Sequence, residues 1–151
     1  MSKEPIVGIF SIKTPKELLA KLEDDYRDCQ RDWADERAAW NFFVTAYHLA
    51  EWVFVVQHPS NPEAVSKALK KLCDNDAYWA ACRYFANSAK HHTLKKPSLQ
   101  LADSTTTTYI QTLDGSRREF AVRINGTEYT TSQLATPIMD RARDRVASVT
   151  Q

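Results

Sequence analysis

Glycine is scarce in this sequence, with only three residues among 151. That scarcity excludes the familiar glycine-rich loops that cradle phosphates, and it favours helices over a turn-rich sandwich. Aromatic residues, in contrast, make up 11% of the chain. At this length we expect one domain, residues 1–151, whose core buries about 68–70% of the unfolded surface.

A charge of one sign is also lacking, because the formal net charge is only +1. No global field therefore attracts nucleic acid or an anionic membrane. The longest nearly apolar run, Trp40–Val56, is shorter than the roughly 20 residues of a membrane span, and it is interrupted by polar residues such as His48 and Glu51. The run Pro5–Ile12, interpreted as an extended segment or an edge strand, is too short for a signal peptide. We therefore expect a cytoplasmic protein with no membrane partner.

Cysteine is limited to Cys29, Cys73 and Cys82, and no Cys-x-x-Cys pair occurs. Each of the three lies among mostly apolar neighbours with helical spacing, which predicts buried, reduced thiols rather than metal ligands or a redox pair. Reduced thiols agree with a cytosolic location. The sequence predicts no metal and no cofactor.

Four helices are predicted from their start signals. Thr14 and Glu17 form a capping box with Pro15 at the first helical position, and Asn61 precedes Pro62 in a similar way. The predicted helices run from Pro15 to about Arg31, over Glu36–Gln57, from Pro62 to about Cys73 and from Asp76 to about His92. Asp32 and Asp35 either start the second helix or lie where the first helix continues into it. We expect them to form a mostly antiparallel four-helix bundle over residues 14–94. Its predicted core includes Leu18, Leu22, Trp40, Phe43, Tyr47, Phe54, Leu69, Leu72 and Phe85.

The chain becomes rich in β-branched residues after residue 104. Asp114-Gly115 and Asn125-Gly126 are hairpin turn signals between alternating segments. The predicted strands are Thr105–Leu113, Arg117–Ile124 and Thr127–Thr131. We expect a three-stranded antiparallel meander over residues 104–131, followed by a terminal helix over residues 136–149 that starts at Thr136-Pro137. The predicted fold class is therefore α+β and mostly helical.

A polar stripe on the predicted helix Glu36–Gln57 gives the strongest functional signal. At 100° per residue the apolar side chains cover two opposite sides, and Asn41, Thr45 and His48 form a line between them. Glu51 follows one turn after His48. A buried carboxylate is costly unless it is paired, so the stripe needs partners or a cleft. The fourth helix offers partners on one face, namely Arg83, Asn87, Lys90 and His91.

If the two stripes face each other, they bring together a carboxylate, two imidazoles and fixed cations. General acid–base chemistry on a phosphodiester uses such groups, because histidine moves protons while arginine or lysine stabilises the developing negative charge. We assign His91 as the acid–base and Lys90 as the group that holds phosphate. Glu51 would orient or pair His48. The candidate catalytic residues are His48, Glu51, Asn87 and His91, and the candidate substrate-binding residues are Lys90 and Arg83.

The helical half, with Arg83, the polar Asn87 and His91 near a helix end, resembles the HEPN superfamily. Members are small helical domains, many of them RNases of toxin–antitoxin and antiviral systems, and they usually act as dimers. Their motif is an arginine, often followed by a polar residue, and then a histidine after a short spacer. Here the spacers from Arg83 to His91 and to His92 are seven and eight residues, longer than in the family motif. The resemblance covers Thr14–Leu94 and implies an RNA partner, a homodimer and a role in metal-independent RNA cleavage or RNA binding.

Other interpretations stay open. His48 and Glu51 lie three residues apart, and paired helices with such spacing build carboxylate di-iron sites, which leaves a metal site as one alternative. A basic and aromatic sheet that binds single strands is another, and its residues would be Arg117, Arg118, Arg123, Tyr109, Phe120 and Tyr129. An interaction or structural protein is the third, with an apolar stripe on the terminal helix that covers the sheet or docks a second subunit: Ile138, Ala142, Val146 and Val149. In that case the polar stripe is a satisfied buried network, or simply faces solvent.

Overall fold

The computed structural model describes residues 11–90, 102–112 and 115–150. Two predictions lie wholly or largely outside them: the extended segment over Pro5–Ile12, and the helix end that carries His91 and His92. The helices are α1 (Pro15–Arg31), α2 (Glu36–Gln57), α3 (Pro62–Asn75), α4 (Ala77–Lys90) and α5 (Thr131–Val149). The strands are β1 (Ala102–Thr112), β2 (Gly115–Ile124) and β3 (Thr127–Thr130). The predicted α+β class, mostly helical, is confirmed.

The first three helices begin at side-chain caps: α1 and α3 at the predicted ones, and α2 at Asp35, which separates it from α1. The side chain of Thr14 accepts a hydrogen bond from the backbone N–H of Glu17 (3.2 Å), and Pro15 takes the first position of α1. Asp35 caps α2 in the same manner, and the Asn61 side chain caps α3. Each of these side chains satisfies backbone donors that have no partner inside the helix.

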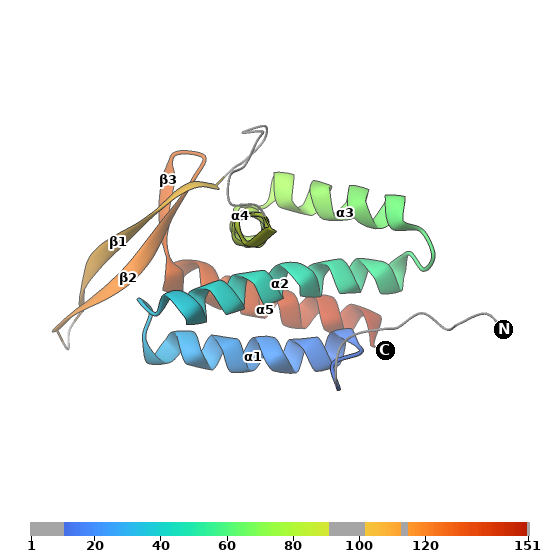
Figure 1. The fold of residues 1–151 in the computed structure, drawn as a ribbon, viewed down its shortest axis with the longest axis horizontal. Coiled ribbons are helices and arrows are strands. Elements are labelled where there is room, and N and C mark those ends of the chain that lie inside the picture. Colours follow the sequence, from blue (N-terminus) through green and yellow to red (C-terminus); the bar gives the residue numbers. More distant parts are fainter. Residues whose placement is uncertain (1–10, 91–101, 113–114, 151) are drawn as a thin grey trace.

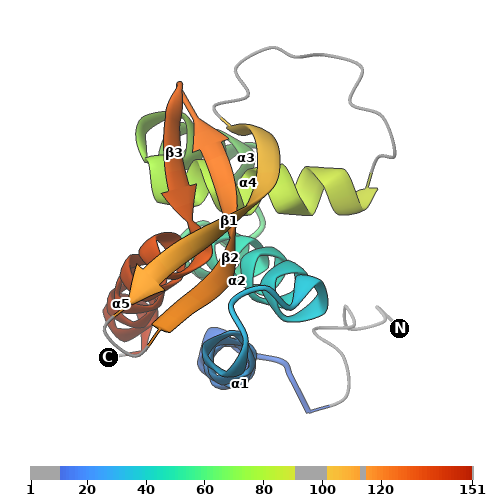
Figure 2. The same ribbon diagram turned by 90° about the vertical axis from the view of Figure 1, so that its left-hand side faces the viewer.

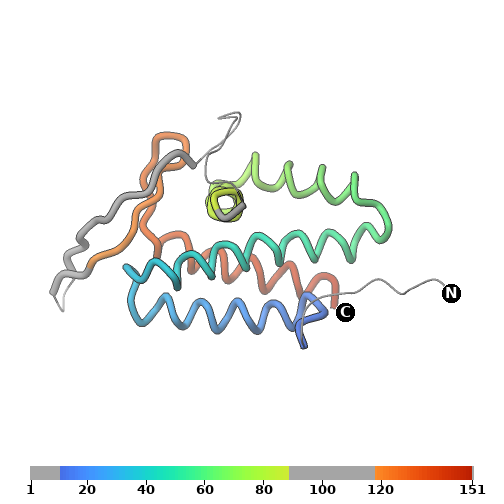
Figure 3. The backbone as a smooth tube through the Cα atoms, in the orientation of Figure 1, coloured from blue at the N-terminus to red at the C-terminus, as the bar shows by residue number. Residues whose placement is uncertain are grey.

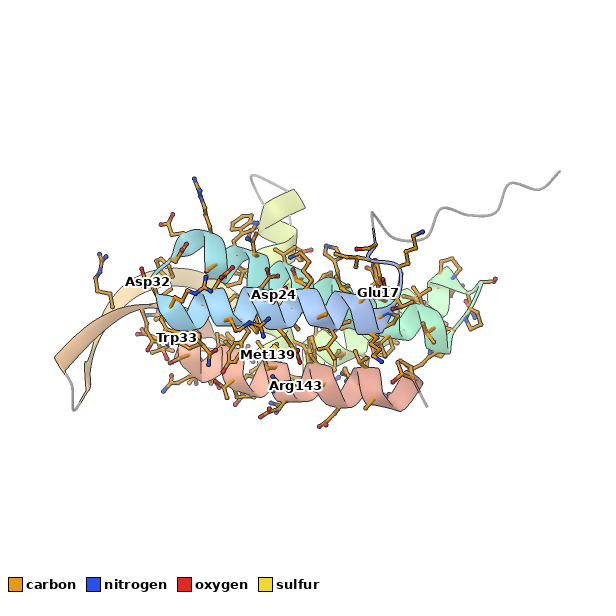
Figure 4. The ribbon with its side chains drawn as sticks, turned by 90° about the horizontal axis from the view of Figure 1, so that it is seen from below. Glu17, Asp24, Asp32, Trp33, Met139 and Arg143 are labelled. Carbon is orange, nitrogen blue, oxygen red and sulfur yellow. The ribbon has the colours of Figure 1, made fainter. Side chains whose placement is uncertain are left out.

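Helix α5 joins α1 and α2 in the centre of the molecule, and the predicted four-helix bundle is not confirmed. Figure 1 shows α1, α2 and α5 side by side, with α2 and α5 running in one direction and α1 in the other, while α4 is seen nearly end-on. Figure 4 shows α1 beside α5 from below, where Arg143 donates to Glu23 at 3.2 Å. The apolar stripe of α5 is buried against α1, α2 and α4 as well as the sheet. It therefore covers chiefly helices, whereas the sequence predicted the sheet.

The start of α5 is a second correction. The predicted start at Thr136-Pro137 is wrong, because the helix already begins at Thr131 and Pro137 lies inside it. A full capping box explains the earlier start: Thr130 accepts from the N–H of Gln133, and the Gln133 side chain accepts from the N–H of Thr130. The buried carboxylate of Glu119 adds to this end, since it accepts the N–H of Ser132 at 2.8 Å.

The sheet lies across the end of the molecule where α2 and α5 begin (Figure 2). Its strand order is β1-β2-β3 and both pairs are antiparallel, with Thr107 opposite Phe120 and Val122 opposite Tyr129. The turn between β2 and β3 uses Asn125 and Gly126 at φ of 50° and 79°, a left-handed conformation that these two residue types tolerate best. The predicted turn at Asp114 lies outside the described residues.

One core cluster includes residues of all five helices and β2. Leu18, Leu22, Phe43, Leu69 and Phe85 are buried as predicted, and the rings of Phe43 and Phe85 stack at 4.6 Å. The prediction for Trp40 is wrong, because its side chain is 42% exposed at the edge of the core. Three further predicted core residues are only partly buried against the cluster: Tyr47, Phe54 and Leu72.

Figure 3 shows that α1 begins at the end of the molecule where α5 ends, and that α1 runs from there to the opposite end. Within the described ranges no helix combines the length and the apolar character that crossing a membrane requires. Cys29, Cys73 and Cys82 are free and buried, as predicted. Burial raises the pKa of Cys29 to about 12 and that of Cys73 to about 11.

Candidate functional site

The predicted polar stripe of α2 is divided between two environments. Helix α2 packs against the other four helices, so little of its circumference is free. Thr45 is buried toward α1, where its hydroxyl donates to Asp25 (2.8 Å) and accepts from the Lys21 ammonium (3.0 Å). Asn41 is exposed and His48 is half-buried. The stripe is therefore neither one continuous cleft nor one buried network.

Tyr47 marks the place where the second half of the stripe meets α4. Its ring lies 5.6 Å from the His48 ring in an edge-on contact. Burial raises the pKa of Tyr47 to about 12, with smaller contributions in the same direction from Cys73 and Glu51, and Arg83 opposes the shift. The phenol is thus within electrostatic reach of Glu51 on α2 and Arg83 on α4. The charges of Glu51 and Arg83 thus both act on a tyrosine that the sequence assigned only to the core, and the His48 ring lies next to it.

Arg83 is held by a carboxylate that the sequence analysis did not include. Its guanidinium donates to Asp74 of α3 at 2.8 Å, and only 17% of its side chain is exposed. Asp74 also accepts from Lys70 at 2.5 Å, and the hydrogen bonds from Lys70 and Arg83 lower the pKa of Asp74. This pairing was not predictable from spacing on one helix, because Asp74 and Arg83 lie on different helices. Arg83 is therefore fixed in place against α3.

The remaining predicted residues lie at the far end of α4. Asn87 is half-buried one turn after Arg83, on the same side of the helix. Lys90 is the last residue of α4, and its side chain lies outside the described part. His91 lies outside it entirely. His48 and Glu51 of α2 and Arg83 and Asn87 of α4 therefore lie on two helices that pack together. Their assembly into one site, and the predicted roles of Lys90 and His91, stay predictions.

Glu51 also borders a groove of about 300 Å³ where α2 ends and α3 begins. Its lining includes His58, Asn61 and Ser66. His58 was treated in the sequence as part of a helix break before Pro59, so its place beside Glu51 was missed. The sequence contained this signal, because His58 comes one residue after the end of α2 and two helical turns after Glu51.

No described residue joins His48 and Glu51 as a third metal ligand. Among residues 11–90, 102–112 and 115–150 there is no group of three or more His, Cys, Asp or Glu side chains that could hold a metal ion. His48 precedes Glu51, the reverse of the Glu-x-x-His order in di-iron motifs, and the described residues supply no further ligands to offset this difference.

The sheet offers little support for single-strand binding. The Phe120 ring borders an apolar cavity of about 290 Å³ together with Trp40 and Phe85, and the Tyr129 ring packs on Tyr78 at 6.3 Å. Both rings face helical residues, whereas a stacking platform presents its rings to solvent. Arg118 and Arg123 are exposed. The side chains of Tyr109 and Arg117 lie outside the described part.

In the comparisons with known proteins, no family model, no curated protein and no solved structure matches the chain. The assignment of a function therefore depends on the residues and their geometry.

Proposed function

We propose that the protein acts on RNA in the manner of HEPN domains, at the face where α2 packs on α4. The observation that carries the proposal is the packing of α2, which bears His48 and Glu51, on α4, which bears Arg83, together with the effect of both Glu51 and Arg83 on the pKa of Tyr47. Asn87 continues the α4 side of this face toward Lys90, the last residue of the helix, and His91 follows Lys90 in the sequence.

The chemistry would be metal-independent acid–base cleavage of a phosphodiester. His91 would transfer the proton and Lys90 would hold the phosphate, whose negative charge grows in the transition state. Glu51 would orient His48. Arg83, already paired with Asp74, would position the α4 residues and add positive charge to the face.

A homodimer in the cytoplasm completes the proposal. Trp40, Val55 and Val56 are large apolar residues of α2 that stay exposed, and such residues suit an interface between subunits. The cytosol would keep the three buried thiols reduced. Sedimentation equilibrium tests the dimer, and a Trp40→Glu variant should shift the protein toward monomer.

The test is an RNA-cleavage assay with and without a chelator, on wild type and on the matched variants His91→Ala and His92→Ala. The variants remove the same side chain at adjacent positions, and circular dichroism would first establish equal folding. We expect chelator-resistant cleavage that His91→Ala lowers by about 10²–10⁴-fold, the usual contribution of a general acid–base group. His92→Ala should retain activity, and His48→Ala should lose part of it.

Other outcomes would change the assignment. Cleavage that a chelator abolishes would point to a metal site. Retention of RNA by a folded, inactive wild type would leave a binding role only.

A non-enzymatic interaction domain is the second candidate, favoured by the same exposed residues, Trp40 and Val55. Neither cleavage nor binding of RNA by a folded wild type would favour it over the RNA proposal.

A further inference from the structure

A second hollow lies away from the face of α2 and α4. It is an open cleft of about 510 Å³ between the end of α2, one side of α3 and the later turns of α5. Its lining residues are Phe54, Ala68, Lys71, Leu72, Asn75, Asp76 and Arg145. Asp74, the α3 residue that holds Arg83, and Lys70, which pairs with Asp74, are not among them. The cleft and the proposed RNA face therefore use different sides of α3.

Arg145 is the unusual residue of this cleft. Three arginines in the described part of the chain are half-buried, and two of them have carboxylate partners: Arg83 pairs with Asp74 at 2.8 Å and Arg141 with Asp76 at 3.5 Å. Arg145 has no hydrogen bond or ion pair through its guanidinium to any described residue. Its guanidinium carbon lies 5.4 Å from the Phe54 ring centroid and 5.5 Å from that of Trp79.

The environment of Arg145 is poorly suited to a lone cation. Burial lowers the pKa of Arg145, and the charges of Asp76 and Cys73 act in the opposite direction. Contact with aromatic faces and the charge of Asp76 offset part of the lost hydration, but Arg145 has no ion-pair contact with a described carboxylate, and a desolvated cation is costly without one. An anion that entered the cleft would meet a guanidinium whose N–H donors no described residue uses.

The cleft also supplies a second cation and a polar group. Lys71 is exposed on its wall, and the Asn75 amide nitrogen donates to the Lys71 backbone carbonyl at 2.7 Å, which leaves the amide oxygen for a ligand. Asp76 is the only carboxylate in the described lining. Its charge is already engaged, because one oxygen accepts from the N–H of Tyr78 and the other faces Arg141.

We propose that this cleft binds a small phosphorylated molecule, with the phosphate between Arg145 and Lys71. A planar guanidinium and a compact ammonium on one cleft are the two side chains that recognise phosphate best, one through a fork of donors and the other as a point charge. A phosphate monoester carries more than one negative charge at pH 7, so it matches two cations better than a singly charged carboxylate would. Phe54 and Leu72 would contact the organic part of the ligand. The site is independent of the RNA proposal.

The test is calorimetric titration and thermal unfolding with inorganic pyrophosphate and with AMP, at constant ionic strength set by chloride. The variant is Arg145→Gln, and its matched control is Arg143→Gln, two residues away on the same helix on the side next to α1 (Figure 4). Lys71→Gln is a second variant at an exposed position, and it keeps the test valid if Arg145→Gln does not fold.

We expect both probes to bind wild type and Arg143→Gln and to raise their unfolding temperatures. Affinity should fall about 10- to 100-fold in Arg145→Gln and in Lys71→Gln, the effect of losing one charge-assisted contact. Arg145→Lys should bind with intermediate affinity. Equal binding by wild type and Arg145→Gln, or binding of neither probe by wild type, would overturn the proposal. Loss of RNA cleavage would leave it unaffected, because the two sites share no residue.

Discussion

The buried thiols should make the protein sensitive to alkali at a pH where most proteins of this size are still stable. A thiol in the unfolded chain ionises around pH 9.0, whereas burial raises the pKa of Cys29 to about 12 and that of Cys73 to about 11 in the folded protein. Burial also raises the pKa of Cys82 well above its usual value. Above pH 9 the unfolded chain therefore releases protons that the native state retains, so stability falls as pH rises.

The size of the effect follows from the two numerical pKa values. Each pH unit between the unfolded and folded pKa of one group changes the free energy of unfolding by about 1.4 kcal/mol. Cys29 and Cys73 together then remove about 3 kcal/mol by pH 10 and about 5 kcal/mol by pH 11. A domain is stable by only about 5–15 kcal/mol, so this loss is a large fraction of the total.

Urea denaturation at pH 7, 9, 10 and 11 measures the loss directly. The double variant Cys29→Ala/Cys73→Ala lowers stability at pH 7 because it opens cavities, but its loss between pH 9 and 10 should be about 2 kcal/mol smaller than that of wild type. The comparison of slopes cancels the baseline difference and the titration of other groups. Parallel slopes for wild type and the double variant would refute the reasoning.

Three further changes test the packing and the caps, each by urea denaturation at pH 7. Thr45→Val removes two hydrogen bonds, to Asp25 and from Lys21, and should cost about 2 kcal/mol; a loss below about 0.5 kcal/mol would mean that water replaces the hydroxyl. Thr130→Ala breaks the capping box of α5 and should cost about 1 kcal/mol, whereas an unchanged midpoint would show that the helix start is fixed by other contacts. Phe43→Ala leaves a cavity where its ring stacks on another at 4.6 Å and should cost about 3–5 kcal/mol; a smaller loss would indicate a core that collapses around the gap.

The helix starts were predictable because their causes are local. Thr14, Asp35 and Asn61 each need only a side-chain oxygen within three residues of the backbone donor, so a sequence of a few letters contains the whole interaction. The turn at Asn125-Gly126 is equally local, since two positive φ angles demand these residue types.

The start of α5 and the exposure of Trp40 have causes that are distant in the chain. Pro137 is the stronger local start signal, yet Thr130 with Gln133 and the carboxylate of Glu119 from β2 fix the helix earlier. Trp40 has the periodicity of a core residue, but its ring meets Phe85 only edge-on and stays partly exposed, whereas the buried ring of Phe43 stacks on Phe85. Periodicity identifies the apolar side of a helix and does not give the extent of its neighbours.

The candidate site, like the fold, was predictable only where its signals are local. The polar stripes on α2 and α4 are visible in the sequence, because both follow helical spacing. Tyr47 and Asp74 were missed as members of the site, since their roles come from packing between α2, α3 and α4. Arg145 was missed, because nothing in its neighbours along the chain distinguishes it from Arg143.

The position of α5 also governs when the protein can fold during its synthesis. Tyr26 of α1 shares a 2.9 Å hydrogen bond with Thr136 of α5 across 110 residues of chain. At roughly 5–20 residues per second, the ribosome needs about 5–20 s to make the segment between them. Until α5 is made, the apolar sides of α1 and α2 have no α5 to cover them. Exposed apolar surface of this kind is what chaperones bind. The native core then forms only once α5 has emerged from the ribosome, well after α1 and α2 have been synthesised.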